Sequence, residues 1–184
     1  MRRAVFLDRD GVLNSNIWNP ATGAYESPLR PEQFELLPKV ISALHLLQDD
    51  GYLLFLVSNQ PNYAKGKATM RTLDAIHRRL ETAMLEACIS FAAYYYCLHH
   101  PLVTGDCFCR KPSPYFLLKA RDLFALDLRQ SWMIGDRQTD IECGLAAGAR
   151  TIGIGALFPP AAEADHIAAD LWQAAQIIVR DLNS

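Results

Sequence analysis

Short apolar runs of strand length alternate with amphipathic helical patterns along most of the chain, and this alternation constrains the fold more than any other feature. The clearest run, residues 52–57, is continuously apolar and is therefore typical of a parallel strand buried on both faces. Strands and helices that alternate in this way form parallel sheets with helices on both sides. We therefore predict an α/β fold of three layers, with a doubly wound, Rossmann-like, mostly parallel sheet in the middle.

We expect one domain over residues 1–184, because the chain shows neither an internal repeat nor a boundary in composition. The expected strands cover residues 3–8, 52–57, 91–96, 132–134 and 151–154. The expected helices cover residues 38–50, 70–88, 114–124, 139–147 and 171–182, the last capped by Asp170. Residues 11–37 lack periodicity and fit a long functional loop, and residues 155–169 give the weakest pattern.

Charge and composition restrict the partners that we expect. The formal net charge is −2 with both signs interspersed, which argues against nucleic acid or a membrane surface as a partner. Only four apolar residues directly precede Asp8, too few for a signal-peptide core or a membrane span, so we expect a cytoplasmic protein. We expect a monomer that acts on a small molecule, and an anionic substrate requires a local basic pocket in a chain so nearly neutral.

Polar side chains follow the ends of four expected strands. Asp8 and Asp10 come first, two residues apart, in a turn marked by Gly11. Alone they are ordinary turn residues, but two carboxylates so close repel each other and require a divalent cation or a shared proton. The other clusters are Ser58 with Asn59, Arg110 with Lys111, and Asp136 with Asp140. Because the carboxyl ends of parallel strands lie at one edge of a sheet, we expect all four clusters in one crevice.

These clusters, in this order and after strands, resemble the four motifs of the haloacid dehalogenase superfamily of phosphatases over residues 6–154. The resemblance implies hydrolysis through an aspartyl-phosphate that depends on Mg²⁺, with Asp8 as the nucleophile. Asp10 would protonate the leaving oxygen and later activate water. Asp8, the backbone carbonyl of Asp10, and Asp136 would hold the Mg²⁺ through oxygen, while Asp140 would support these ligands from behind.

The same resemblance gives roles to the remaining polar residues. Ser58 would donate a hydrogen bond to a phosphate oxygen, and Lys111 would bridge the phosphate and the nucleophile. Asn59, Arg110 and Arg137 would bind substrate, since arginine makes two-pronged contacts with phosphate. Without the neighbouring carboxylates, Ser58 would be an ordinary turn hydroxyl and Lys111 a solvated surface charge.

Metal-binding side chains gather in the loop after the third strand, at Cys97, His99, Cys107 and Cys109. Three thiolates and one imidazole form a closed set suited to a tetrahedral, structural Zn²⁺. His100 is a possible substitute for His99, and a disulfide between Cys97 and Cys107 is an alternative that a reducing compartment disfavours. Four further residues of these types are expected to be ordinary core or helix residues: Cys88, Cys143, His45 and His77.

The pattern Cys-x-His…Cys-x-Cys-Arg-Lys-Pro narrows the resemblance to the heptose-bisphosphate phosphatases and the related histidinol-phosphate phosphatases. It implies a core with a minimal cap, in which the zinc loop stiffens the segment that carries the two following cations. Residues 11–14 and 64–66 look more like the heptose enzymes, which hydrolyse the 7-phosphate of D-glycero-D-manno-heptose 1,7-bisphosphate in lipopolysaccharide or S-layer synthesis. Residues 14–31, residues 59–67 and the zinc loop would then shape the substrate pocket.

The sequence departs from the heptose pattern in one loop. Pro61 and Asn62 stand where a Ser-Gly pair is usual, and Lys65 stands where arginine is usual, which leaves another anomer or another sugar phosphate open. One alternative function is a histidinol-phosphate phosphatase. An alternative from another class is an inactive zinc-stabilised binding module, which the intact Asp8 and Asp136 disfavour. A DNA 3′-phosphatase would need a basic surface that the near-neutral charge does not provide.

Overall fold

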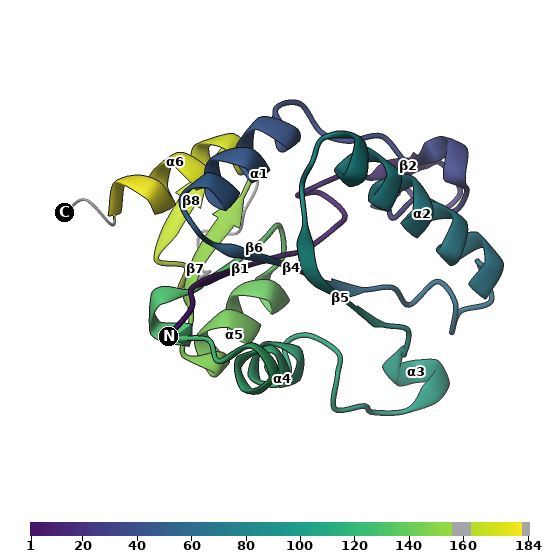
Figure 1. Cartoon of the computed structure of the whole chain (residues 1–184). Helices are drawn as coiled ribbons and strands as arrows, with labels where there is room; N and C mark the ends of the chain where they lie inside the picture. The colour runs from purple at the N-terminus through teal and green to yellow at the C-terminus, as the bar shows by residue number, and fades with distance from the viewer. Residues whose placement is uncertain (156–162, 182–184) are drawn as a thin grey trace.

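Six parallel strands form the central sheet, in the order β5–β4–β1–β6–β7–β8 (Figure 1). The computed structural model describes residues 1–155 and 163–181. The strands are β1 (Ala4–Leu7), β4 (Leu53–Asn59), β5 (Phe91–Cys97), β6 (Trp132–Gly135), β7 (Arg150–Ile154) and β8 (His166–Ala168). The chain starts in the middle of the sheet at β1, runs outward to β5, and then builds the other half from β6 to β8. The predicted doubly wound parallel sheet is confirmed.

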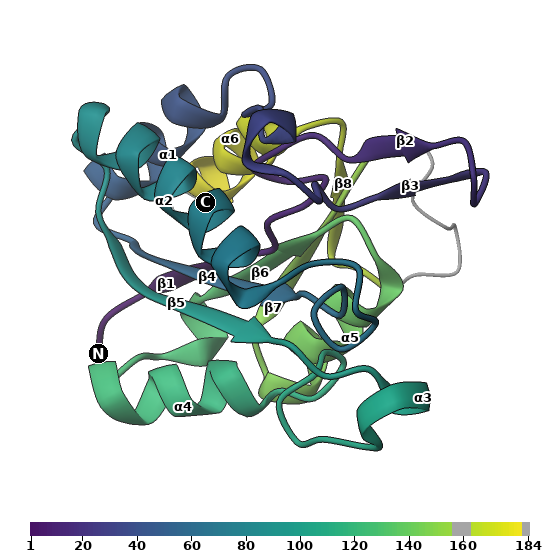
Figure 2. The same cartoon turned by 90° about the vertical axis from the view of Figure 1, so that its right-hand side faces the viewer.

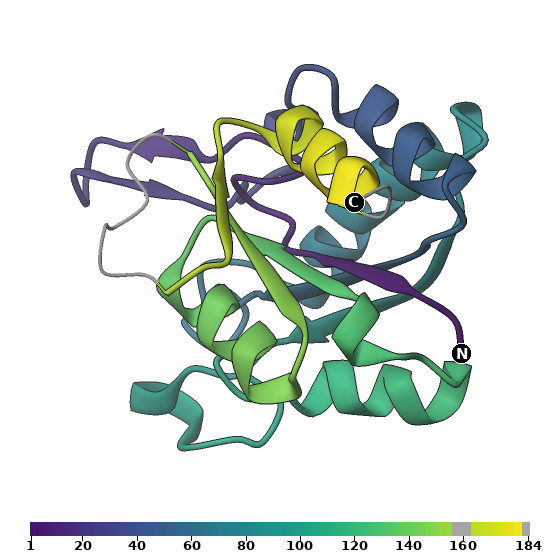
Figure 3. The ribbon, with the colours of Figure 1, turned by 90° about the vertical axis from the view of Figure 1, so that its left-hand side faces the viewer.

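Helices cover both faces of the sheet and make the three predicted layers (Figures 1 and 3). One layer consists of α1 (Val40–Asp49), α2 (Met70–Glu86) and α6 (Leu171–Asp181), and the other of α4 (Tyr115–Phe124) and α5 (Gln138–Ala147). Side chains alternate along a strand, so Val5 and Leu7 pack in the first core while Ala4 and Phe6 pack in the second. Within the described residues, we find no helix with the length and apolar character needed to cross a membrane.

The ends of the expected elements differ from the observed ones by a few residues. Helix α6 begins as predicted, because Asp170 accepts a hydrogen bond from the backbone N–H of Gln173 at 2.8 Å, whereas Leu182, its expected end, lies outside the described residues. Strands β4 and β5 extend further than predicted, so Ser58, Asn59 and Cys97 belong to strands. These three residues are therefore fixed by the hydrogen bonds of the sheet.

Several short elements occur where no regular structure was expected. They are the hairpin β2 (Ile17–Asn19) and β3 (Ala24–Glu26), the helix α3 (Pro101–Thr104), the 3₁₀ turns η1 (Pro31–Gln33) and η2 (Leu128–Gln130), and strand β8. Strands of three residues are too short to show alternation in a sequence. The hairpin is stabilised by the edge-to-face rings of Trp18 and Tyr25, whose centroids lie 5.2 Å apart. The hairpin and α3 project beyond the same end of the sheet (Figure 2).

Phe55 on β4 offers a test of the second core. Its side chain is fully buried, and its ring lies 5.1 Å from that of Phe6 and 5.0 Å from that of Phe124, centroid to centroid. We predict that Phe55→Ala lowers the free energy of unfolding by roughly 3–5 kcal/mol, because the cavity cannot collapse between a strand and a helix. Urea unfolding followed by circular dichroism measures this loss. The control Leu85→Ala, at an exposed position of α2, should change stability by less than about 0.5 kcal/mol.

Candidate active site

Three carboxylates meet at the carboxyl ends of the two central strands. Asp8 follows β1, Asp136 follows β6, and Asp140 lies in the first turn of α5. One oxygen from each of these side chains lies within 4.8 Å of the others. Strands β1 and β6 are neighbours at the point where the winding of the sheet reverses, which is where open α/β sheets bind their ligands.

Lys111 reaches into this cluster from the segment after the cysteine-rich loop. Its side chain is 2% exposed, and its Nζ donates to Asp8 Oδ1 at 2.9 Å and to the carbonyl oxygen of Val57 at 2.6 Å. The third partner is Asp140 Oδ1 at 2.7 Å. Burial alone lowers the pKa of this ammonium, but the charges of Asp140 and Asp8 outweigh burial and raise its pKa above the usual value. Lys111 is therefore a fixed positive charge beside Asp8.

Asp140 has both of its oxygens engaged. Oδ1 pairs with Lys111, and Oδ2 accepts a hydrogen bond from the backbone N–H of Arg137 at 3.0 Å. Its side chain is also almost completely buried. Through these contacts Asp140 holds Lys111 and the start of α5 in position.

Asp136 has the properties of a cation ligand. Its Oδ1 atom is buried and has no hydrogen-bond partner among the described residues. Burial, together with the charges of Asp8 and Asp140, raises the pKa of Asp136 to about 7. Gly11 makes room for this side chain, because a Cβ at that position would lie 2.2 Å from Asp136 Oδ2 and the backbone there has φ +87°. The carboxylates of Asp8 and Asp136 thus fit a divalent cation with oxygen ligands.

Asp10 is held apart from that cluster by a set of hydrogen-bond donors. Its Oδ1 accepts from Arg9 Nη2 at 3.0 Å and from Asn14 Nδ2 at 3.0 Å, and its Oδ2 accepts from Gln60 Nε2 at 2.6 Å. Burial raises the pKa of Asp10, but Arg9, these two amides and the hydroxyl of Ser27 outweigh it and lower the pKa below its usual value. The free protein therefore favours ionised Asp10.

Asn59 and Ser58, at the end of β4, use their side chains for hydrogen bonds within the protein. The side-chain amide of Asn59 is used at both ends, since its Nδ2 donates to the carbonyl of Lys111 and its Oδ1 accepts from the N–H of Lys111, both at 3.1 Å. Ser58 is buried, and its hydroxyl accepts from Gln60 Nε2 at 3.0 Å. Asn59 therefore holds the Lys111 segment against β4 while it lines the cavity described next.

A cavity of about 430 Å³ opens onto Asp8, Asp10 and Lys111. The hairpin contributes Tyr25 and Glu26, with Ser27 directly after it, and the segment after β4 contributes Pro61, Asn62, Lys65 and Lys67. Arg110 and Arg137 also line this cavity. Half of the residues that line the cavity come from residues 14–31 and 59–67, which are two of the three loops that the sequence predicts to shape the pocket. The cationic side chains give a nearly neutral protein the local basic pocket that an anionic ligand requires.

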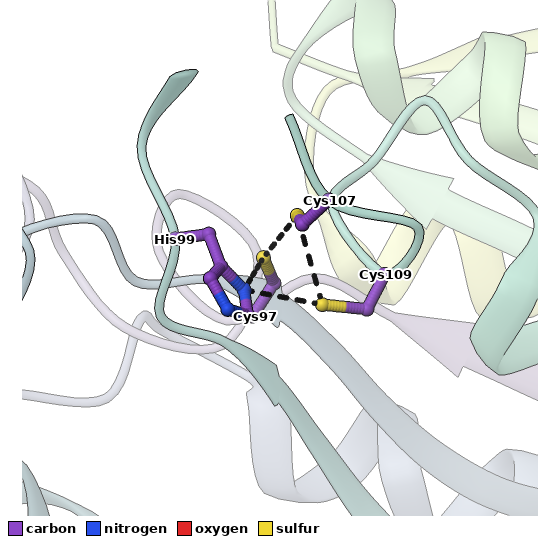
Figure 4. Close-up of side chains that lie close together, drawn as sticks. All are labelled: Cys97, His99, Cys107 and Cys109. Carbon is purple, nitrogen blue, oxygen red and sulfur yellow. Dashed lines mark hydrogen bonds between the residues drawn. The ribbon is translucent and has the colours of Figure 1, made fainter. Parts of the chain in front are cut away.

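The predicted zinc ligands Cys97, His99, Cys107 and Cys109 point toward one another (Figure 4). Cys97 Sγ lies 3.6 Å from His99 Nδ1 and 3.6 Å from Cys107 Sγ. Cys109 Sγ lies 3.5 Å from His99 Nδ1 and 3.8 Å from Cys107 Sγ. The sulfur atoms are too far apart for a disulfide, and four donor atoms at such separations fit around a single metal ion. Arg110 is tied to this loop, because its Nη1 donates to the carbonyl of His99 at 3.2 Å.

The two cysteines outside this cluster were both expected in the core, and the expectation is wrong for one of them. Cys143 is buried in α5, as predicted, whereas Cys88 is exposed. Helix α2 ends at Glu86, and Cys88 takes a φ of +54° as the chain reverses, which turns its side chain away from the core. The apolar periodicity of the sequence continues past this reversal and does not reveal it.

Comparison with known proteins gives several related matches. A family model described as HAD-hydrolase-like matches residues 108–174. The D-glycero-beta-D-manno-heptose-1,7-bisphosphate 7-phosphatase of Escherichia coli K12 is 33% identical over 153 residues, which cover 80% of this chain and 76% of that protein. The chain belongs to the haloacid dehalogenase (HAD) family of phosphatases. A relative of this HAD phosphatase in Photorhabdus laumondii, named for the alpha anomer, is 30% identical over 79% of this chain and 78% of that protein.

Solved structures agree with this assignment. The D,D-heptose 1,7-bisphosphate phosphatase of B. bronchiseptica, crystallised with magnesium and phosphate, matches this HAD phosphatase with a TM-score of 0.81 and 25% identity. The match covers 97% of this chain and 99% of that one. A putative HAD-like phosphatase from Mesorhizobium loti matches with a TM-score of 0.77 and 26% identity over 96% and 87% of the two chains.

Two buried residues of the site, Arg9 and Gln60, were not predicted from the sequence. Arg9 stands between two aspartates and reads as a solvated turn residue, yet it is 1% exposed. Gln60 is equally buried, and its amide reaches Asp10 from fifty residues away. The only available signal is their position beside Asp8 and Ser58 at the ends of expected strands.

A proton and a divalent cation would compete for Asp136, and this competition predicts how Mg²⁺ binding would depend on pH. Because the pKa of Asp136 is about 7 in the cation-free protein, Mg²⁺ affinity should fall by about tenfold per pH unit below that value and level off above it. Isothermal titration calorimetry between about pH 5.5 and pH 8 measures the effect. Asp136→Asn should abolish binding, and the exposed control Asp49→Asn should retain the wild-type profile. Affinity that is independent of pH across this range would contradict the prediction.

Proposed function

We propose that this HAD phosphatase hydrolyses a sugar bisphosphate, D-glycero-D-manno-heptose 1,7-bisphosphate, at its 7-phosphate and leaves the 1-phosphate. The single observation that carries the proposal is the buried Asp8–Lys111 pair, which opens onto a cavity lined by further cations. A phosphate dianion repels carboxylates, so only a site with excess positive charge brings one to Asp8. The names of the heptose phosphatases that the chain matches over most of its length support this choice of sugar.

In the first half of the proposed reaction, an oxygen of Asp8 attacks phosphorus. A bond forms between that oxygen and phosphorus, and the bond from phosphorus to the sugar oxygen breaks with its electron pair on the sugar oxygen. That oxygen takes a proton from Asp10. Lys111 holds Asp8 and balances the negative charge of the transferring group. The added charge of the bound dianion raises the pKa of Asp10, so that the carboxyl group takes up the proton that it delivers.

In the second half, water attacks the aspartyl-phosphate. Asp10, ionised after the first half, accepts a proton from this water while the bond between phosphorus and Asp8 breaks. The strong donors around Asp10 favour this ionised form. Ser58 does not line the cavity, and its buried hydroxyl lies beside Gln60, so the predicted donation to a phosphate oxygen would require this hydroxyl to turn toward the substrate.

The distal end of the substrate requires its own cations. Lys65, Arg110 and Arg137 line the cavity together with Asn59. Arg137 also approaches the cluster, because its Nε lies 3.9 Å from Asp136 Oδ1, but its side chain is largely exposed. We infer that these cations bind the sugar and its second phosphate, for which the guanidinium groups are well shaped. Pro61 and Asn62, which depart from the heptose pattern, line the same cavity and set its shape near the sugar.

Two metal ions complete the proposal. Asp8 and Asp136, with the backbone carbonyl of Asp10, would hold Mg²⁺, which supplies positive charge against the phosphate oxygens when bound. The Cys97 cluster would hold Zn²⁺, because bonds of about 2.3 Å to sulfur and about 2.0 Å to nitrogen in a tetrahedron require ligand separations of about 3.5–3.8 Å. The four separations in this structure run from 3.5 to 3.8 Å.

Asp8→Asn tests the nucleophile, because the amide keeps the shape of the carboxylate and cannot form the aspartyl-phosphate. We expect kcat for heptose bisphosphate to fall by at least about 10³-fold, measured as phosphate release with Mg²⁺ present. The matched control Asp49→Asn, at an exposed site on α1, should turn over like the wild type. The substrates compared are both anomers of heptose 1,7-bisphosphate, histidinol phosphate and other sugar phosphates. Wild-type turnover by Asp8→Asn, or a higher kcat/KM for histidinol phosphate, would contradict the proposal.

Cys107→Ser tests the zinc site. Wild-type protein purified under reducing conditions should contain zinc, and the variant should lose it and unfold at a lower temperature, because metal binding stabilises the folded loop. Elemental analysis and thermal unfolding measure the two effects. The control Cys88→Ser changes an exposed cysteine outside the cluster and should keep both the zinc and the melting temperature. Absence of zinc from the wild type would contradict the assignment.

A further inference from the structure

Arg9 is the least expected charged residue of the protein. Its side chain is 1% exposed, although it lies between two aspartates in a turn. Its guanidinium makes contacts of 3.2 Å from Nε and 3.0 Å from Nη2 to Asp10 Oδ1, and of 3.2 Å from Nη2 to Asp10 Oδ2. A buried arginine with two-pronged contacts fixes both the position and the plane of its carboxylate partner.

Gln60 holds the same carboxylate from another strand. Its Nε2 donates to Asp10 Oδ2 at 2.6 Å and to Ser58 Oγ at 3.0 Å. One amide nitrogen thus joins the proposed acid and base to the proposed phosphate-binding hydroxyl. Neither Arg9 nor Gln60 lines the substrate cavity, so both lie behind Asp10 as seen from that cavity.

Arg9 is itself supported from behind by Tyr96 on β5. The Cζ atom of Arg9 lies 6.0 Å from the centroid of the Tyr96 ring, and the hydroxyl of Tyr96 lies 3.0 Å from Nδ1 of His77 on α2. Tyr96 thus lies between the Arg9 guanidinium and the imidazole of His77. These residues line a smaller cavity of about 180 Å³ on this side of Arg9 and Gln60.

We propose that Arg9 and Gln60 are positioning residues that aim the Asp10 carboxylate at the leaving oxygen, and that Tyr96 fixes Arg9 for this task. The inference rests on the proposed function, in which Asp10 protonates that oxygen. Proton transfer falls off steeply when a donor is misplaced, so the orientation of this carboxylate controls the rate of the first half of the reaction. Neither residue touches substrate, and both act through Asp10.

A comparison of leaving groups tests this role. A sugar oxygen needs a proton as it leaves, whereas p-nitrophenolate leaves without one, so kcat/KM for p-nitrophenyl phosphate is insensitive to general acid catalysis. For Gln60→Met we expect kcat/KM for heptose bisphosphate to fall by about 10- to 100-fold, and kcat/KM for p-nitrophenyl phosphate by less than about 3-fold. Asp10→Asn, measured as a reference, should show the same pattern more strongly. An equal loss on both substrates would overturn the proposal, because a merely structural role affects both alike.

Tyr96→Phe provides a second test, which still applies if the Gln60→Met variant does not fold. It removes only the hydroxyl of the tyrosine that lies beside the Arg9 guanidinium, and we expect about a 3- to 10-fold loss of kcat/KM that is confined to the sugar substrate. The matched control Tyr94→Phe removes a hydroxyl two residues away on the same strand, whose ring packs on His77. Tyr94→Phe should turn over both substrates like the wild type. Identical behaviour of the two tyrosine variants would overturn the role of Tyr96.

The outcomes also separate this inference from the proposed function. If the wild type fails on heptose bisphosphate but hydrolyses another sugar phosphate, the proposed substrate is wrong, and the same comparison made with that ester still decides the positioning role. If the wild type hydrolyses neither a sugar phosphate nor p-nitrophenyl phosphate, both proposals fall. A selective loss on sugar phosphates supports the positioning role whichever sugar is preferred.

Discussion

The buried ammonium of Lys111 is the interaction on which the rest of the site depends. It joins the end of β1 through Asp8, the end of β4 through the carbonyl of Val57, and the start of α5 through Asp140. A buried charge is stable only when it is paired and fully hydrogen-bonded, and here all three of its protons have acceptors. Three segments that are distant in sequence are thereby held in the register that phosphate chemistry requires.

Charge balance favours a cation at this arrangement of carboxylates. Four carboxylates, Asp8, Asp10, Asp136 and Asp140, gather around two cations, Arg9 and Lys111. When all are ionised, four negative and two positive charges leave a formal charge of −2, which the exposed Arg137, with its Nε 3.9 Å from Asp136 Oδ1, offsets only in part. Burial and the charges of Asp8 and Asp140 therefore raise the pKa of Asp136. A divalent cation carries enough positive charge to remove this imbalance. The same imbalance makes the cations around the cavity necessary for an anionic substrate.

The sequence reveals which strand ends meet, because topology alone brings the carboxyl ends of parallel strands to one edge. For that reason Asp8, Lys111 and Asp136 could be placed together without a structure. The direction in which a long side chain folds depends on its tertiary neighbours, and so the buried course of Arg9 and the double contact of Gln60 could not be. Short strands such as β2 and β3 escape prediction for a different reason, since three residues are too few to show a period.

The cysteine cluster is connected directly to residues that support Asp8 and Asp10. The backbone N–H of Gln60 donates to the carbonyl of Cys97 at 2.7 Å, so the residue that holds Asp10 is hydrogen-bonded to the first ligand of the cluster. The last ligand, Cys109, lies two residues before Lys111. A metal ion bound by this cluster would tie Cys97 to Cys109 and would thereby fix the supports of both Asp10 and Asp8 at once. The proposed metal ion would thus be useful so close to a hydrolytic site even with no open coordination position.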